Sequence, residues 1–304
     1  MHIDGLVALA GLLVGFVVGL TGMGGGALMT PILVLLFHIE PLAAVSSDLV
    51  AAVIMKPVGG LVHARRGTVD MRLVRLLCLG SVPSAFAGVL LLKSLGSGDD
   101  LQNTIKKILG VALLLAASAI IGKAAVQRGR SVRLEISEVQ MKALPTIAIG
   151  VLGGFVVGMT SVGSGSLMIV FLLMLYPSLS AAQLVGTDLV QAVPLVMSAA
   201  LGHIIFGDFQ LGLTASLLIG SIPGVYLGAR ASANAPDSVI RPALVTVLVL
   251  SGMKLLGASN GALGGVLVFA GVIAVGMLIR ARTQARSRDA RPADEPRSSS
   301  EAEL

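Results

Sequence analysis

Long apolar stretches separated by short polar connections occupy almost the whole chain. A helix needs about 20 predominantly apolar residues to cross a lipid bilayer, and most of these stretches have about that length. The uninterrupted stretches are residues 41–62, 73–92 and 105–122 in the first half of the chain and residues 180–206, 211–229, 240–256 and 262–279 in the second. The pattern therefore predicts an all-α polytopic membrane protein.

Two further apolar stretches, residues 5–37 and 143–176, are interrupted by glycine and hydroxyl residues. The first interruption, residues 21–26, reads Thr-Gly-Met-Gly-Gly-Gly, and the second, residues 160–166, reads Thr-Ser-Val-Gly-Ser-Gly-Ser. Glycine costs about 1 kcal/mol relative to alanine inside a helix, so neither helix is expected to continue through its interruption, which we call a glycine break. If each broken stretch enters the membrane and returns, as a re-entrant hairpin or as two full spans, the protein has about 8–9 spans or more.

The two halves of the chain resemble each other in sequence. Residues Gly15–Met29 match Gly154–Met168 almost letter for letter, and the similarity continues at a constant offset, as from Asp48 to Asp188. Duplicated, interrupted helices point to the substrate site of a secondary transporter. We therefore predict two transmembrane repeats whose glycine breaks meet near the middle of the bilayer. The predicted parts are a first repeat (1–123), a linker (124–142), a second repeat with one extra span (143–279) and a tail (280–304).

Charged loops predict how the repeats are oriented, because lysine and arginine mark the cytoplasmic side of a membrane protein. The loop at residues 63–75 carries four arginines, whereas the equivalent loop at residues 203–210 carries neither lysine nor arginine. Equivalent loops are thus expected on opposite sides, which predicts inverted-topology repeats. The linker and the tail are also basic and are expected in the cytoplasm, the tail as a disordered segment because it has too few apolar residues to form a core.

Composition agrees with a membrane location and narrows the chemistry. The chain is 55% hydrophobic and 12% charged, with a mean hydropathy of +0.93, and we expect it in the cytoplasmic membrane of a bacterium. The single cysteine, Cys78, excludes an internal disulfide and a multi-thiolate metal site. We therefore expect no cofactor, no metal and no nucleic-acid partner. The expected partners are a small anion and the lipid bilayer, and a homo-oligomer is compatible with the sequence.

The glycine breaks are the candidate substrate site. Free amides where each returning helix begins, together with the helix dipole, favour an anion, and serine or threonine hydroxyls can donate to its oxygens. The alternative is that the glycines only allow helices to pack closely. The candidate residues are Thr21, Gly24, Gly25 and Gly26 in the first break, Thr160, Ser161, Gly163, Ser164 and Gly165 in the second, and Ser47 and Thr187 on the helices that follow.

Three charged residues fall inside predicted spans. Asp48 and Asp188 lie about 10 Å from the start of their helices, so each needs a partner or a proton. Two roles stay open for them: carrying a coupling proton, or hydrogen-bonding to a glycine break. Lys56, whose repeat position is occupied by Val196, could attract the anion, pair with Asp48 or extend toward the basic loop.

The two histidines His63 and His203 fall near helix ends, where a position at the membrane interface and a role in proton transfer are both open. A distant histidine and Ser164 could also form an intramembrane serine hydrolase. The repeat argues against this enzyme, because Gly25 occupies the position of Ser164 in the first break. We therefore expect that the chain is not an enzyme.

The order of motifs resembles one known family. A glycine break, a helix containing Ser-Ser-Asp-Leu or Gly-Thr-Asp-Leu, and a histidine before a short loop occur twice over residues 5–279. This order is similar to that of the sulfite exporter TauE/SafE family of membrane permeases. The resemblance implies a transporter for sulfur-containing anions such as sulfite or sulfonates, driven by an ion gradient. Thiosulfate-handling relatives look built around cysteines, so Cys78 alone disfavours thiosulfate. A gated anion channel is the main alternative.

Overall fold

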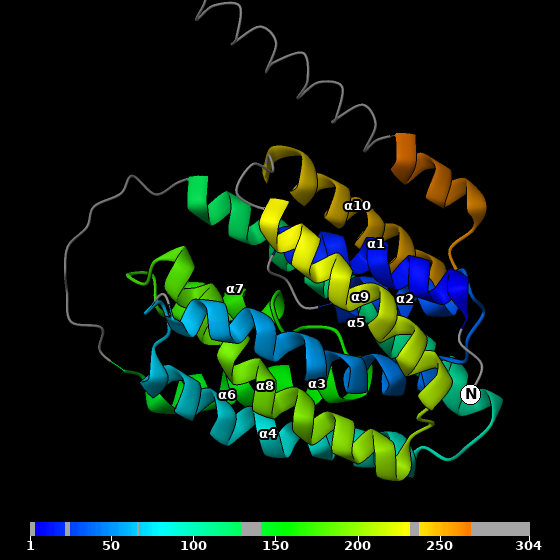
Figure 1. The fold of residues 1–304 in the computed structure, drawn as a ribbon, viewed down its shortest axis with the longest axis horizontal. Helices are drawn as coiled ribbons and strands as arrows, with labels where there is room; N and C mark the ends of the chain where they lie inside the picture. The colour runs from blue at the N-terminus through cyan, green and yellow to red at the C-terminus, as the bar shows by residue number, and fades with distance from the viewer. Residues whose placement is uncertain (1–3, 22–24, 66, 129–140, 232–236, 269–304) are drawn as a thin grey trace, which may run out of the picture.

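The structure, a computed structural model, describes residues 4–21, 25–65, 67–128, 141–231 and 237–268, and these residues contain helices and connections but no strand. Figure 1 shows the helices packed side by side in one bundle. In chain order they are α1 (Gly5–Thr21), α2 (Gly26–Leu35), α3 (Pro41–Arg65), α4 (Met71–Ser94), α5 (Asp99–Arg128), α6 (Ala143–Thr160), α7 (Leu167–Leu175), α8 (Ala181–Phe206), α9 (Leu211–Ala231) and α10 (Asp237–Leu255).

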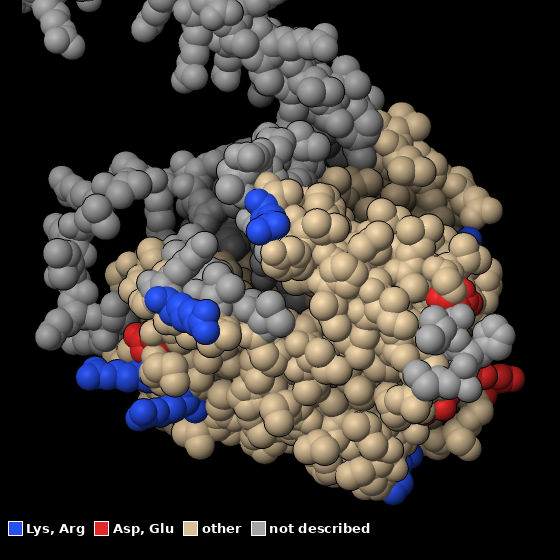
Figure 2. Space-filling model, viewed as in Figure 1, with Lys and Arg blue, Asp and Glu red and all other residues tan. Residues whose placement is uncertain are grey.

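The outer surface of the bundle is suited to lipid. Five of the described helices are long and apolar enough to cross a membrane. Large apolar side chains such as Leu79 and Leu152 are 65% and 60% exposed, a pattern that is unfavourable in water when it covers a large surface. In Figure 2, charged side chains lie mainly toward two opposite ends, with an uncharged surface between them. The prediction of an all-α polytopic membrane protein is confirmed.

Both glycine breaks separate a long helix from a short one. Helix α1 ends at Thr21 and α6 at Thr160, and the helices that follow, α2 and α7, have only 10 and 9 residues. At 1.5 Å per residue, each short helix is about 15 Å long, half the thickness of the hydrocarbon layer. Each broken stretch therefore consists of one longer helix and one half-length helix. The helix that follows the break is too short to span the membrane.

Helix packing follows the sequence repeat. Helix α1 of the first half packs along α9 of the second, and α6 of the second packs along α4 of the first. The same small residues make both contacts: Gly15 approaches Ser221, and Gly154 approaches Ser81. A Cβ atom at Gly15 would lie 2.6 Å from the Ser221 carbonyl oxygen, and one at Gly154 would overlap the Ser81 carbonyl. The first helix of each half thus packs against the other half of the chain, through the equivalent helices α9 and α4, as expected of paired repeats. Their inverted orientation and their predicted boundaries stay predictions.

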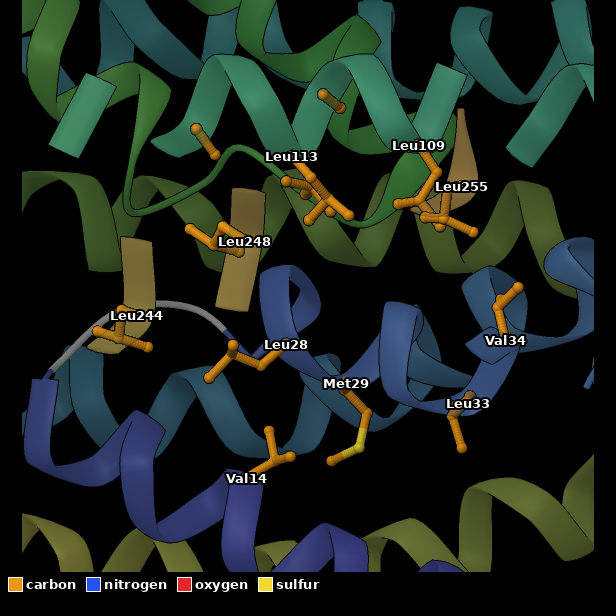
Figure 3. Close-up of a cluster of buried hydrophobic side chains, with 14 of the residues drawn as sticks. Val14, Leu28, Met29, Leu33, Val34, Leu109, Leu113, Leu244, Leu248 and Leu255 are labelled. Carbon is orange, nitrogen blue, oxygen red and sulfur yellow. The ribbon is translucent and has the colours of Figure 1, made fainter. Parts of the chain in front are cut away.

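The short helix α2 is held in an apolar core. Leu28, Met29 and Leu33 are buried in one cluster with side chains of α1, α5 and α10 (Figure 3). Burying a leucine or methionine side chain contributes about 1.5–3 kcal/mol, which fixes α2 although it is too short to be stable alone. The position of the first glycine break is therefore set by this core.

The C-terminal predictions fall largely outside the described residues. Residues 260–268 are helical, which is the start of the extra span predicted near 262–279. The remainder of that span and the tail at 280–304 lie outside the described residues, so the predicted disorder and cytoplasmic location of the tail stay predictions.

Candidate functional site

The two glycine breaks contact each other, so that one sequence repeat touches the other at this point. Gly26, the first residue of α2, packs against the backbone of Ser161, the residue that follows α6, and a Cβ atom at Gly26 would overlap the Ser161 carbonyl oxygen. Ser161 has a left-handed backbone (φ 61°), and its amide donates to the Val157 carbonyl at 2.8 Å. The structure therefore brings the two breaks together as the sequence predicts.

The second break folds back on itself through its own polar groups. The Thr160 hydroxyl donates to the Val156 carbonyl at 2.7 Å and accepts from the Val162 amide at 3.1 Å. Gly163 and Gly165 have φ angles of 124° and 94°, which residues other than glycine rarely adopt. These two glycines are thus required by the turn itself, and Thr160 is occupied in holding it.

Several amides at the start of the two short helices have partners within the chain. The amides of Ser166 and Leu167 both point to the Gly163 carbonyl, at 3.4 and 3.1 Å, and at the start of α2 the Leu28 and Met29 amides bond to the Gly25 carbonyl, at 3.0 and 2.9 Å. The expectation of free amides at the start of the returning helices is wrong for these positions, because a glycine carbonyl in each break folds onto them. At the start of α7, side chains are therefore the candidate groups for holding an anion.

Asp48 connects three elements through one carboxylate oxygen. Its Oδ2 accepts from the Thr30 hydroxyl of α2 at 2.9 Å and from the Ser161 hydroxyl of the second break at 2.7 Å. The side chain is 3% exposed, so these charge-assisted bonds replace the water that an ionised carboxylate would otherwise need. A residue of the first repeat therefore holds the break of the second.

Lys56 holds the same break from the same helix. Its Nζ donates to the Ser164 hydroxyl, and its side chain is 8% exposed. Lys56 also interacts electrostatically with Asp188 and Asp48. The alternative that Lys56 extends toward the basic loop is wrong, since the ammonium group lies buried at the second break. The equivalent residue of the second repeat, Val196, is an apolar core residue with 0% exposure.

Asp188 has a partner that the sequence analysis missed. The Gln191 amide Nε2 donates to Asp188 Oδ1 at 3.0 Å, and Gln191 Oε1 accepts from the Ser81 hydroxyl at 3.3 Å. Gln191 is fully buried and lies one turn after Asp188 on α8, within a mostly apolar run. An amide side chain one turn after an aspartate in a predicted span was the sequence signal that could have identified this partner. The first repeat has Ala51 at this position, so the two aspartates have different partners.

Ser47 and Thr187 lie within α3 and α8, and their hydroxyls contact the connections that precede α9 and α4. The Gln210 amide donates to the Ser47 hydroxyl at 3.4 Å, and the Asp70 amide donates to the Thr187 hydroxyl at 3.0 Å. Asp70 and Gln210 immediately precede α4 and α9 and are equivalent in the repeat. The two hydroxyls therefore position the starts of these helices. Of the remaining candidates, Gly24 and the side chain of Thr21 lie outside the described residues.

His203 is buried in a hydrogen-bonded position. Its Nε2 lies 2.8 Å from the Gly158 carbonyl and its Nδ1 lies 2.8 Å from the Ser46 hydroxyl. Because the carbonyl can only accept, Nε2 carries a proton, and the Ser46 hydroxyl, which lies 2.7 Å from the Leu42 carbonyl, can donate either to that carbonyl or to Nδ1. The expected helix-end position is confirmed, but the ring is 0% exposed. The His203 ring nitrogens contact Ser46 and Gly158, while Ser164 bonds to Lys56, so the proposed serine–histidine pair is not formed. The side chain of His63 lies outside the described residues.

Comparison with known proteins agrees with this architecture. A family model described as "Sulfite exporter TauE/SafE" matches residues 7–255. The "Probable membrane transporter protein YjnA" of Bacillus subtilis (strain 168) is 39% identical over 252 residues, 82% of this chain and 98% of that protein. The "Probable membrane transporter protein YdhB" of the same organism is 26% identical over 257 residues, 83% and 99% of the two chains. No solved structure gives a significant match. The chain is therefore a multi-pass membrane transporter that belongs to the sulfite exporter TauE/SafE family.

Proposed function

We propose that this protein is a secondary transporter that moves a small oxyanion of the sulfite or sulfonate class across the cytoplasmic membrane, driven by an ion gradient. The observation that carries the proposal is the buried Lys56 ammonium, which donates to Ser164 in the second glycine break. An ammonium group inside a membrane protein is costly and is retained where it serves a substrate or ion pathway.

The surroundings of Lys56 suit an oxyanion. Ser164 belongs to the break, and two residues later the buried Ser166 hydroxyl has no hydrogen-bond partner within the described structure. An oxyanion with several acceptor oxygens could accept from the ammonium group and from both hydroxyls, and charge-assisted bonds of this kind are about twice as strong as neutral ones. We therefore assign the anion to Lys56, Ser164 and Ser166.

The position of these groups supports a transporter. They lie where a half-length helix begins and where one repeat contacts the other, the arrangement in which secondary transporters hold substrate and coupling ions. The sulfur-containing class comes from the family to which the chain belongs. A gated anion channel would share the same ligands, so a kinetic test is needed to separate it from a transporter.

Reconstituted protein tests the proposal directly. Proteoliposomes are loaded with unlabelled sulfite or ethanesulfonate, and uptake of the labelled anion is measured, with sulfate and acetate as competitors. A transporter gives saturable uptake that is accelerated by the same anion on the opposite side. Conductive flux without this acceleration would indicate a channel, and the absence of sulfite and ethanesulfonate flux would overturn the proposed substrate class.

A matched pair of lysine variants tests the site. Lys56→Met should lower uptake about 10- to 100-fold, the equivalent of losing a charged hydrogen bond of about 1.5–3 kcal/mol. Lys107→Met, which removes an exposed lysine on α5, should leave uptake unchanged. Ser164→Gly, which copies Gly25 of the first break, should reduce uptake but not abolish it. Equal uptake by Lys56→Met and Lys107→Met would remove Lys56 from the site.

A further inference from the structure

We infer that the anion moves together with a proton in the same direction, and that Asp48, rather than Asp188, binds this proton. The inference rests on the proposed anion site at Lys56. It assigns different roles to two aspartates that occupy equivalent positions in the sequence repeat.

The balance of buried charge requires a positive ion to accompany the substrate. Among the described residues, the buried carboxylate and ammonium side chains are Asp48, Lys56 and Asp188, and His203 is a buried imidazole whose Nε2 donates to the Gly158 carbonyl. One ammonium group therefore already serves two carboxylates. An anion bound to Lys56 would add a further negative charge in a medium of low dielectric constant, which is strongly unfavourable. A proton bound to one carboxylate restores the balance.

The hydrogen-bond partners select Asp48 as the proton acceptor. Its Oδ2 contacts two hydroxyls, those of Thr30 and Ser161. A hydroxyl can accept as well as donate, so either partner can rotate to accept from a protonated Asp48. Both protonation states of this carboxyl can thus be satisfied without moving the backbone.

Asp188 has partners that favour a fixed carboxylate. The Gln191 NH₂ group that contacts Asp188 Oδ1 can only donate, and the Gln191 carbonyl oxygen is already accepting from Ser81. A proton on this oxygen of Asp188 would face the amide hydrogens, and reversing the amide would disturb the bond to Ser81. The contact with Gln191 at Oδ1 therefore favours the ionised form of Asp188, which acts electrostatically on Lys56.

Protonation of Asp48 has a structural consequence at the anion site. Ser161 is held in a left-handed conformation beside Gly26, three residues before Ser164. Neutralising Asp48 weakens its bond to Ser161 by about half and removes one of the two negative charges that act on Lys56, and this second effect strengthens the attraction between the ammonium group and an anion. Because binding linkage is reciprocal, an anion at Lys56 favours the protonated Asp48 to the same extent that the proton favours the anion.

The groups around Asp48 are consistent with this linkage. Lys56 on the same helix is the charged group that acts on it, and Asp188 on α8 acts on the same lysine. Helix α2 and the second break present the hydroxyls already described. From the other packed helices, α5 presents Ile105 and α9 presents Thr214 near this part of α3, both uncharged. The carboxylate and its two hydroxyls could also hold a sodium ion, which the experiment separates from a proton.

The experiment compares exchange with accumulation in the same proteoliposomes. Ethanesulfonate is the main probe, because it stays ionised throughout the pH range and any proton that moves with it is bound by the protein; sulfite is the second probe. Exchange is measured between equal pools without a gradient. Accumulation is measured with an alkaline interior, and an internal pH dye follows proton entry, with protein-free vesicles as the blank.

Wild-type protein should accumulate the anion and acidify the interior in step with it. Asp48→Asn should keep exchange but bring the inside-to-outside ratio of the anion close to one, because asparagine mimics the neutral acid. Asp188→Asn should lower exchange and accumulation in proportion and keep the wild-type ratio. Proton entry with wild-type protein needs no variant, so it tests the symport even if Asp48→Asn does not fold.

Different results would overturn different parts. Wild-type accumulation without proton entry, or accumulation driven by a sodium gradient alone, would overturn the proton symport while leaving the transporter intact. Accumulation by Asp48→Asn at the wild-type ratio would overturn the assignment to Asp48. The absence of exchange by wild-type protein with both probes would overturn the proposed function, and this inference with it.

Discussion

The α-carbon of Gly26 lies directly against the carbonyl group of Ser161, where the two glycine breaks touch. The preceding residue, Gly25, has open space around it: a Cβ atom there would meet the nearest side-chain atom, a methyl group of Val18, at 3.7 Å. Two adjacent glycines in one break thus have opposite tolerance for a methyl group. The contact between repeats depends on residue 26.

This difference predicts unequal effects of two alanine substitutions. Gly26→Ala should push α2 away from the second break and destabilise the protein by about 1–3 kcal/mol, the usual cost of overpacking, with loss of most anion exchange. Gly25→Ala should cost far less, because Gly25 already has helical backbone angles. Thermal unfolding in detergent and exchange in proteoliposomes measure both effects. Similar losses in the two variants would contradict the interlocking at residue 26.

A second prediction concerns the glycines between helices. Gly154→Ala should lower the free energy of unfolding by about 1–3 kcal/mol, because the added methyl group would overlap the Ser81 carbonyl. Gly15→Ala should behave in the same way at the equivalent contact with Ser221. Gly122→Ala on α5 is the control: nothing lies within 4 Å of the new Cβ atom, and removing a helical glycine should stabilise by about 0.5–1 kcal/mol. Equal stability of all three variants would show that close helix contact is not needed.

The helices themselves were predictable from the sequence. The apolar stretches 180–206 and 211–229 became α8 and α9 with boundaries that differ by at most two residues. Long apolar runs in a membrane form helices because the backbone must satisfy its own hydrogen bonds there. The breaks were also predictable, since clustered glycines do not support a helix. The half-length of α2 and α7 was left open.

The polar contacts of the site were only partly predictable. Lys56 could be singled out because the equivalent position of the second repeat holds the apolar Val196. Its partner Ser164 lies in the other half of the chain and could not be predicted. Gln191 and Thr30 were missed because their partners are set by three-dimensional packing. The amides at the start of α7 bond to the Gly163 carbonyl because of the turn at Gly163. Composition alone does not predict the geometry of this turn.

A labelling experiment tests the inverted orientation of the repeats. In a Cys78→Ala background, single cysteines at Arg65, the last residue of α3, and at Asp208, two residues after α8, place thiols beside equivalent loops that differ in charge. An impermeant maleimide added to intact cells should label the cysteine at position 208, whereas the one at position 65 should react only after permeabilisation. Reaction of both cysteines from the same side of the membrane would rule out inverted repeats.

The last prediction separates His203 from proton coupling. His203→Phe removes both hydrogen bonds of the ring and leaves the Gly158 carbonyl and the Ser46 hydroxyl without this partner, so unfolding should become easier by about 1–3 kcal/mol. His203→Gln keeps a donor of similar reach and should cost less. Both variants should keep the wild-type ratio of accumulation to exchange, because we propose that the coupling proton binds at Asp48 and because the His203 ring joins α8 to α3 and α6. Thermal unfolding and the two flux measurements decide the matter: if His203→Gln exchanges ethanesulfonate normally but no longer accumulates it, the proton passes through His203.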